Sequence, residues 1–277
     1  MPLLSKEEVL GRKLNCIPRE QLIVLAHSLS LSGRGSVAKI TKELIESNPN
    51  EEYVDNFIKD EYAKLIELRR ARISDENLRQ ELKKVDNFSW GVVQGRLDSK
   101  IQQQYVRRIV TYDNLVSRVA AGLHDEITDY VVCTWFNHWT TQLIEEHISA
   151  HKCVIPTLKN VKGVDLFFDG QPFDLKTTYL PKDYDPTAAL KNPSDLAIWM
   201  YENQGAERFG SDNRLFVILF DKENPSLSWQ LKRDFDLVFD SIDDFFDTEK
   251  VSSDDEIEFY FNEKLYHPIS KVLLITK

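Results

Sequence analysis

A short hairpin signal, Asp169-Gly170, constrains the middle of this 277-residue chain more than any other feature. It lies between "VDLFF" and "QPFDLK", and Asp-Gly favours a type I′ turn because both central residues of that turn need positive φ. A two-residue turn here places Asp165 directly opposite Asp174 on the neighbouring strand. Because strand side chains alternate between faces, Lys176 joins the two carboxylates on one face, while the other face is almost purely apolar.

Two directly opposed carboxylates repel each other, so stability alone does not explain this pair. A divalent cation removes the repulsion, because carboxylate oxygens are its preferred ligands, and the Leu175 carbonyl can add another oxygen. Lys176 is then close enough to orient a water or to stabilise charge. This set of groups suits metal-assisted phosphodiester hydrolysis. The alternative is a Lys176 salt bridge that neutralises one acid on an exposed sheet face.

The segments around the hairpin predict an α/β fold. A long helix is expected from about residue 122, followed by a strand at "KCVIPTL" and then the hairpin. A further helix starts at Asn192-Pro193-Ser194 and ends at Gly205, and the apolar run "NRLFVILFD" predicts a buried central strand. The last 50 residues predict acidic loops in "SIDDFFDTEKVSSDDE" and strands at "IEFYF" and "KVLLIT".

The pattern "VD", eight residues, "DLK" resembles the motif of the PD-(D/E)XK nucleases, the restriction-endonuclease-like superfamily. The predicted order of elements over about residues 120–220 is also similar to the αβββαβ core of that superfamily, although Val164 stands where the family name has proline. The resemblance implies a mixed-sheet nuclease domain over residues 121–277. It implies Asp165 and Asp174 as ligands of Mg²⁺, and Lys176 as the residue that positions or activates the attacking water.

Many such nucleases supply a glutamate from the helix before the hairpin. Glu126 is the first choice here, because it lies near the expected start of that helix. It would join the aspartates and the Leu175 carbonyl as a metal ligand and catalytic group. Glu145 and Glu146, at the other end of the helix, come second. The alternative for Glu126 is an acid near a helix N-terminus that stabilises the helix dipole.

Residues 1–120 predict a helical region that helps to hold DNA. Within residues 1–50, two helical segments joined by "SLSGRGS" resemble the SAP domain, a small DNA-binding module, and an ordinary helical hairpin is the alternative. Cations interleaved with amide and aromatic groups suit phosphate and base contacts, although a solvated helix face also explains them. The candidate DNA contacts are Arg34, Gln94, Arg96, Lys100, Arg107, Arg108, Gln204 and Arg208, with Arg214 nearby.

The composition of the chain limits its possible partners and its cellular compartment. A net charge of −10 argues against non-specific coating of polyanions, but Lys and Arg slightly outnumber Asp and Glu in residues 1–110. Three scattered cysteines suggest free thiols in a reducing, cytoplasmic setting. No long apolar run or secretory signal is evident, so no membrane association is expected. His147 and His151 have the i, i+4 spacing of zinc ligands, but no third ligand is evident, so a surface or helix-terminus role is favoured.

These observations predict a Mg²⁺-dependent endonuclease that hydrolyses double-stranded DNA. A type II restriction endonuclease is the leading subtype, because all parts lie in one chain of moderate size without helicase motifs. The resemblance implies a homodimer and a cognate DNA methyltransferase in the same system. The alternatives are a structure-specific nuclease of repair, recombination or transposition, a non-catalytic nucleic-acid-binding protein, and an acidic interaction protein in which the motif is accidental.

Overall fold

The structure is a computed structural model that describes residues 3–88, 101–203 and 212–277, except the side chain of Glu126. The chain forms two compact units. Unit 1 comprises residues 1–72 and 145–277, and unit 2 comprises residues 73–144. The boundary expected between residues 120 and 121 lies inside the long helix α7 (Tyr112–Ser149).

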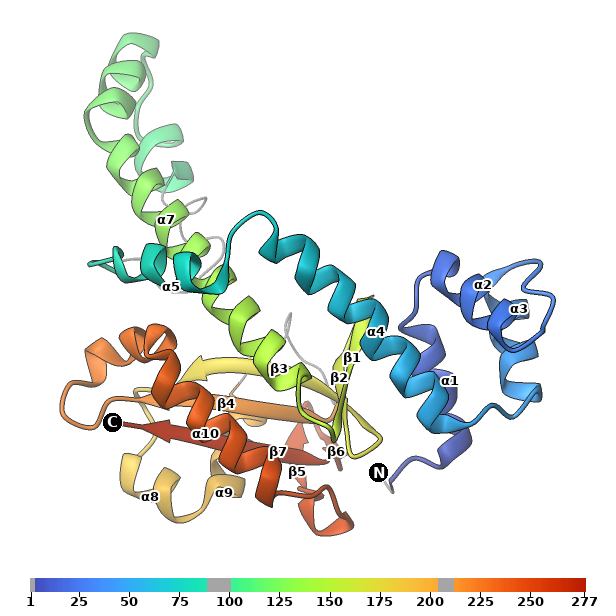
Figure 1. The fold of residues 1–277 in the computed structure, drawn as a ribbon. Coiled ribbons are helices and arrows are strands. Elements are labelled where there is room, and N and C mark those ends of the chain that lie inside the picture. Colours follow the sequence, from blue (N-terminus) through green and yellow to red (C-terminus); the bar gives the residue numbers. More distant parts are fainter. Residues whose placement is uncertain (1–2, 89–100, 204–211) are drawn as a thin grey trace. The chain divides into compact units, whose positions relative to one another are not determined.

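Unit 1 holds a sheet surrounded by helices (Figure 1). Its helices are α1 (Lys6–Asn15), α2 (Arg19–Ser28), α3 (Val37–Glu46), α4 (Glu51–Arg70), the end of α7, α8 (Pro186–Lys191), α9 (Pro193–Glu202), η3 (Pro225–Arg233), α10 (Phe235–Thr248) and η4 (Ser253–Asp255). Its strands are β1 (Val154–Val161), β2 (Val164–Phe168), β3 (Gln171–Tyr179), β4 (Arg214–Phe220), β5 (Phe259–Phe261), β6 (Lys264–Tyr266) and β7 (Ser270–Thr276). Unit 2 holds α5 (Asp75–Lys83), the π-helix η1 (Ile101–Val106) and most of α7.

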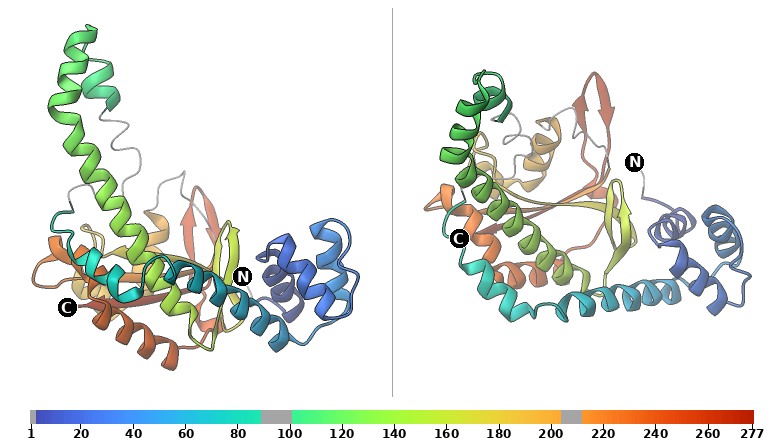
Figure 2. Two further views of the ribbon diagram at one scale, coloured as in Figure 1. Left: turned by 45° about the horizontal axis from the view of Figure 1, so that its top comes forward. Right: turned by 90° about the horizontal axis from the view of Figure 1, so that it is seen from above.

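The sheet is mixed, which confirms the predicted α/β class. Its strand order is β1-β2-β3-β4-β7, with β1 to β3 antiparallel and β3, β4 and β7 parallel. Every residue of β4 is buried, because this strand is central and helices cover both faces of the sheet. Helices α8 and α9 lie on one face and α10 lies on the other (Figure 2).

The N-terminal helices pack against the antiparallel end of the sheet. Apolar residues of α1 to α4 form one core with Ile155, Val164 and Phe167 of β1 and β2. The expected helix–loop–helix is present as α2 and α3, with Pro18 at the N-cap of α2 and Ser36 capping α3. The core ties this helical pair to the hairpin that carries Asp165.

Several expected boundaries differ from the structure. The acidic segment "SIDDFFDT" is not a loop but most of α10, because Val238, Ile242 and Phe246 repeat every four residues and bury one face. Helix α7 begins at Tyr112 and not near residue 122. The "IEFYF" segment contributes only the short strand β5, which pairs with β6 outside the main sheet, whereas "KVLLIT" lies in β7 as predicted.

Helix α9 ends at Glu202, and Gly205, the expected stop, lies outside the described residues. In the part of the chain that the structure describes, no helix has the length and apolar character needed to cross a membrane.

A buried ion pair fastens α1 to α4. The side chain of Lys13 is 1% exposed, and its Nζ lies 2.6 Å from Asp55 Oδ1 and 3.1 Å from Glu51 Oε1. We expect Asp55→Ala to lower the free energy of unfolding by about 3 kcal/mol, because it leaves a buried ammonium with only the more exposed Glu51 as partner. Urea unfolding followed by circular dichroism measures this loss.

Glu46→Ala is the matched control, because it removes the exposed Lys42–Glu46 pair on α3. We expect that change to cost at most about 0.5 kcal/mol. Equal losses in the two variants would show that the Lys13 pair does not depend on its burial.

Candidate functional site

The hairpin between β2 and β3 has the predicted register. Asp169 and Gly170 have φ of 45° and 77°, as a type I′ turn requires. Phe168 pairs with Gln171 and Leu166 pairs with Phe173, so one further step outward along both strands sets Asp165 opposite Asp174. The prediction that this turn brings the two carboxylates together is confirmed.

Hydrogen bonds hold both carboxylates. Asp165 Oδ2 accepts the backbone N–H of Leu175 at 2.8 Å. Asp174 Oδ1 accepts from Lys176 Nζ at 3.0 Å, and Asp174 Oδ2 accepts from Arg214 Nε at 2.9 Å. The three predicted residues of the hairpin therefore lie together on one face, as the alternation of the strand requires.

The electrostatics of the pair follow from this crowding. Desolvation raises the pKa of Asp165 and the neighbouring carboxylate of Asp174 raises it further, whereas the N–H of Leu175 lowers it. A raised carboxyl pKa means that the negative charge is poorly compensated. The surroundings of Asp165 thus disfavour its charged form, through burial first and through the like charge of Asp174 second.

Arg214 belongs to this site, although its sequence position suggested a different role. From the sequence it could contact DNA or carry a solvated charge, but it is buried, with its guanidinium 4.9 Å from the centre of the Tyr201 ring and bound to Asp174. The parallel register of β3 and β4 sets Arg214 directly beside Asp174. The signal in the sequence was its place at the start of the buried run "RLFVILF", where a cation needs an acidic partner.

The helix before the hairpin also supplies a glutamate. Glu145 lies near the end of α7, is half-buried, and has its pKa raised to about 7 by desolvation and then by the charge of Asp165. Lys176 and the buried Lys232 oppose that shift. Glu145 is therefore electrostatically coupled to both Asp165 and Lys176.

The two other glutamates are placed differently. Glu146 is buried, and its carboxylate accepts hydrogen bonds from Arg69 of α4. Glu126 does not lie near the start of its helix as expected, since α7 begins at Tyr112, and its side chain lies outside the described residues. Because α7 ends at Ser149, just before β1, its last turn is the part of the helix that the short connection keeps beside the hairpin.

The donors of this site are oxygens, which a hard divalent cation prefers, but the carboxylate oxygens of Asp165, Asp174 and Glu145 do not all lie within 4.8 Å of one another. A carboxylate has about four acceptor sites, so the contacts of Asp165 and Asp174 leave lone pairs available. Those oxygens and the Glu145 carboxylate match the ligand preference of Mg²⁺, which keeps several waters and needs few protein ligands. A cation bound here would relieve the repulsion between Asp165 and Asp174 that contributes to the raised pKa of Asp165.

The predicted DNA contacts fall in separate regions. Arg34 is exposed in the loop between α2 and α3 of unit 1. Arg107 and Arg108 are exposed just after η1 of unit 2, where Arg108 and Arg118 line an open pocket of about 660 Å³. The remaining residues of that set lie outside the described residues: Gln94, Arg96, Lys100, Gln204 and Arg208.

Comparisons of the chain with protein-family models, with curated proteins and with solved structures found no match. The geometry of unit 1 therefore provides the basis for inferring a function.

Lys232 gives a test of the charges around Glu145. Burial lowers its pKa from 10.5 to about 8, so the folded protein releases this proton at a lower pH than the unfolded chain does. The unfolded state then binds more protons between about pH 8 and pH 10, and the free energy of unfolding rises with pH across that interval. We expect Lys232→Met to flatten this rise, as measured by urea unfolding at pH 7.5 and 9.5.

Lys222→Met, at an exposed position after β4, serves as the control and should keep the wild-type slope. An unchanged pH dependence in Lys232→Met would mean that Lys232 is charged in the folded protein up to its ordinary pKa.

Proposed function

We propose that this protein is a Mg²⁺-dependent nuclease that hydrolyses phosphodiester bonds of DNA. The observation that carries the proposal is the opposed pair Asp165 and Asp174, with Lys176 hydrogen-bonded to Asp174 on the same face. Two carboxylates and an ammonium at this spacing can hold a cation and a phosphate oxygen side by side.

The order of elements supports the same proposal. Along the chain, α7 is followed by β1, β2, β3, two helices and β4, which is similar to the αβββαβ core of the PD-(D/E)XK nucleases. In that arrangement the two aspartates come from β2 and β3, the lysine follows on β3, and a glutamate comes from the preceding helix. Glu145 is the glutamate whose charge is coupled to that of Asp165.

Each residue has a distinct part in the proposed reaction. Asp165, Asp174 and Glu145 would hold Mg²⁺, and the carbonyl of Leu175, which follows Asp174 in the sequence, would add a further oxygen. A bound Mg²⁺ supplies Lewis acidity toward the phosphate and lowers the pKa of a coordinated water. The Nζ of Lys176 orients the attacking water and compensates charge that develops on the phosphate. Arg214 fixes the carboxylate plane of Asp174 and so acts as a positioning residue.

Within this class we propose a type II restriction endonuclease that acts on duplex DNA as a homodimer beside a cognate methyltransferase. All the residues of the proposed site lie in unit 1. Exposed cations at Arg34, Arg107 and Arg108 supply phosphate contacts. Cleavage of branched or nicked DNA in place of a short duplex sequence would assign the chain to repair or recombination.

A second candidate is a nucleic-acid-binding protein that does not cut. Both oxygens of Asp174 are already engaged, one by Lys176 and one by Arg214. Such a network can also serve only to neutralise charge inside the sheet. Binding of DNA without cleavage in Mg²⁺ would favour this candidate.

The first experiment incubates a long duplex of mixed sequence with purified protein in Mg²⁺ or EDTA. We expect discrete fragments only with Mg²⁺, and we expect Asp165→Ala, Asp174→Ala and Lys176→Ala each to reduce cleavage about 100-fold or more. Binding of DNA in Ca²⁺ should survive in at least some of these variants. Asp254→Ala, an exposed acid of η4 in the same unit, is the control and should cut like the wild type.

Full activity in Lys176→Ala or Asp174→Ala would count decisively against this site. Intact duplex DNA in every lane calls for branched and nicked substrates next. Failure there as well would leave the binding protein.

The choice of glutamate has its own test. We expect Glu145→Gln to reduce cleavage about 100-fold, because an amide cannot supply the charge that a metal ligand needs. Glu126→Gln, on the same helix, should have little effect. Loss of activity in Glu126→Gln with normal activity in Glu145→Gln would reverse the assignment.

A further inference from the structure

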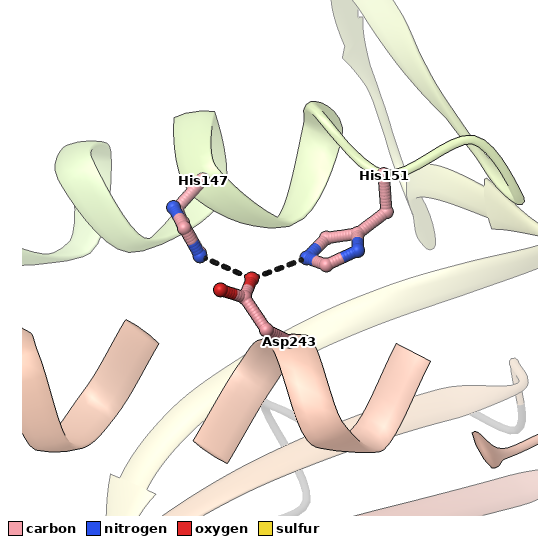
Figure 3. Close-up of side chains that lie close together, drawn as sticks. All are labelled: His147, His151 and Asp243. Carbon is pink, nitrogen blue, oxygen red and sulfur yellow. Dashed lines mark hydrogen bonds and ion pairs between the residues drawn. The ribbon is translucent and has the colours of Figure 1, made fainter. Parts of the chain in front are cut away.

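A second cluster of possible metal ligands lies where the end of α7 packs against α10. His147 is in the last turn of α7, His151 follows the helix, and Asp243 projects from α10 toward both (Figure 3). The Nε2 atom of His147 is 2.7 Å from Asp243 Oδ1, and the Nε2 atom of His151 is 3.1 Å from the same oxygen. Two imidazoles and one carboxylate thus converge on one point from two elements of unit 1.

Aromatic side chains of α10 hold both rings in place. The His147 ring stacks on Phe239, with centroids 3.8 Å apart and an angle of 4° between the planes. The His151 ring stacks on Phe246 at 4.9 Å. Packing of this kind restricts the rotation of the rings, so the two Nε2 atoms reach the same point with little entropy left to lose.

We propose that His147, His151 and Asp243 bind a divalent transition-metal ion of the zinc class. Among the described residues, these three side chains form a group of possible metal ligands. Their ligand atoms all lie within 4.8 Å of one another. Three protein ligands with an open fourth position are a common arrangement around zinc. The proposal does not depend on the nuclease assignment.

The geometry fits such an ion closely. Zinc–nitrogen and zinc–oxygen bonds of about 2.0–2.1 Å in a tetrahedron put neighbouring ligand atoms about 3.3 Å apart. The distances of 2.7 and 3.1 Å from the carboxylate oxygen are already close to that value. The ligand nitrogens of the two histidines lie within 4.8 Å of each other.

The donor types separate this site from the carboxylate pair of the hairpin. Imidazole nitrogen suits Zn²⁺, Cu²⁺, Ni²⁺ and Co²⁺, whereas Mg²⁺ prefers oxygen alone. The two sites should therefore take different metals from a mixture. The competing explanation is a simple hydrogen-bond network, in which two imidazole N–H groups donate to Asp243 and no metal binds.

The experiment uses the full chain without a histidine tag, stripped of metal by chelation and studied without DNA. Titration with Zn²⁺ against a chromogenic chelator should reveal one site in the wild type that millimolar Mg²⁺ does not block. We expect His147→Ala, His151→Gln and Asp243→Ala each to bind Zn²⁺ at least about 100-fold more weakly, since even groups that only orient a ligand affect affinity by 10- to 100-fold. His124→Gln on α7 and Asp244→Asn on α10 are the matched controls and should bind like the wild type.

Two readouts of the wild type keep the test independent of how well the variants fold. Zn²⁺ but not Mg²⁺ should raise the melting temperature, and Co²⁺ should give the visible absorption bands of a tetrahedral complex. A wild type with no Zn²⁺ stabilisation and no Co²⁺ bands would overturn the proposal. So would Zn²⁺ affinity that is unchanged in both His151→Gln and Asp243→Ala.

Because no DNA enters these measurements, a failure here leaves the cleavage test of Asp165 and Asp174 untouched. Failure of cleavage likewise leaves the zinc titration unaffected.

Discussion

Mutual repulsion of Asp165 and Asp174 is the constraint around which the middle of unit 1 is arranged. A two-residue turn forces the carboxylates opposite each other, and the sheet then supplies compensating groups from three directions: a backbone N–H from Leu175, an ammonium from Lys176 and a guanidinium from Arg214. The Leu175 contact with Asp165 depends on the register of β2 against β3, and the Arg214 contact depends on the register of β3 against β4. Lys176 lies two residues from Asp174 on the same strand, so alternation alone keeps it on that face. The antiparallel and parallel halves of the sheet are therefore both needed to stabilise one pair of charges.

Local sequence determined the hairpin and the central strand because their signals are local. Asp169-Gly170 selects a turn type, and an uninterrupted apolar run of strand length such as that of β4 is typical of a strand buried on both faces. The helix α10 was missed for a related reason. Its many aspartates suggested a loop, whereas its structure follows from the spacing of its buried apolar residues, which decides more than the fraction of charge does.

Partners that come from distant segments could not be predicted in this way. Arg214 meets Asp174 only because β4 lies parallel to β3, and Asp243 meets His147 only because α10 packs beside the end of α7. The preference for Glu126 arose from placing the start of its helix about ten residues too late. With α7 beginning at Tyr112, Glu126 lies well inside the helix, whereas Glu145 lies near the end that a short connection joins to β1.

The last turn of α7 links the two candidate sites without merging them. Residues two apart on an α-helix point about 200° away from each other, so Glu145 and His147 face nearly opposite sides of the same turn. Glu145 is directed toward the charges of the hairpin, and His147 is stacked against α10, while Glu146 between them is bound to Arg69 of α4. An ion bound by His147, His151 and Asp243 would link the end of α7 to α10, on the side of the helix opposite Glu145. That link would hold Glu145 at a constant distance from Asp165. Two carboxylates that bind one cation need such a fixed separation.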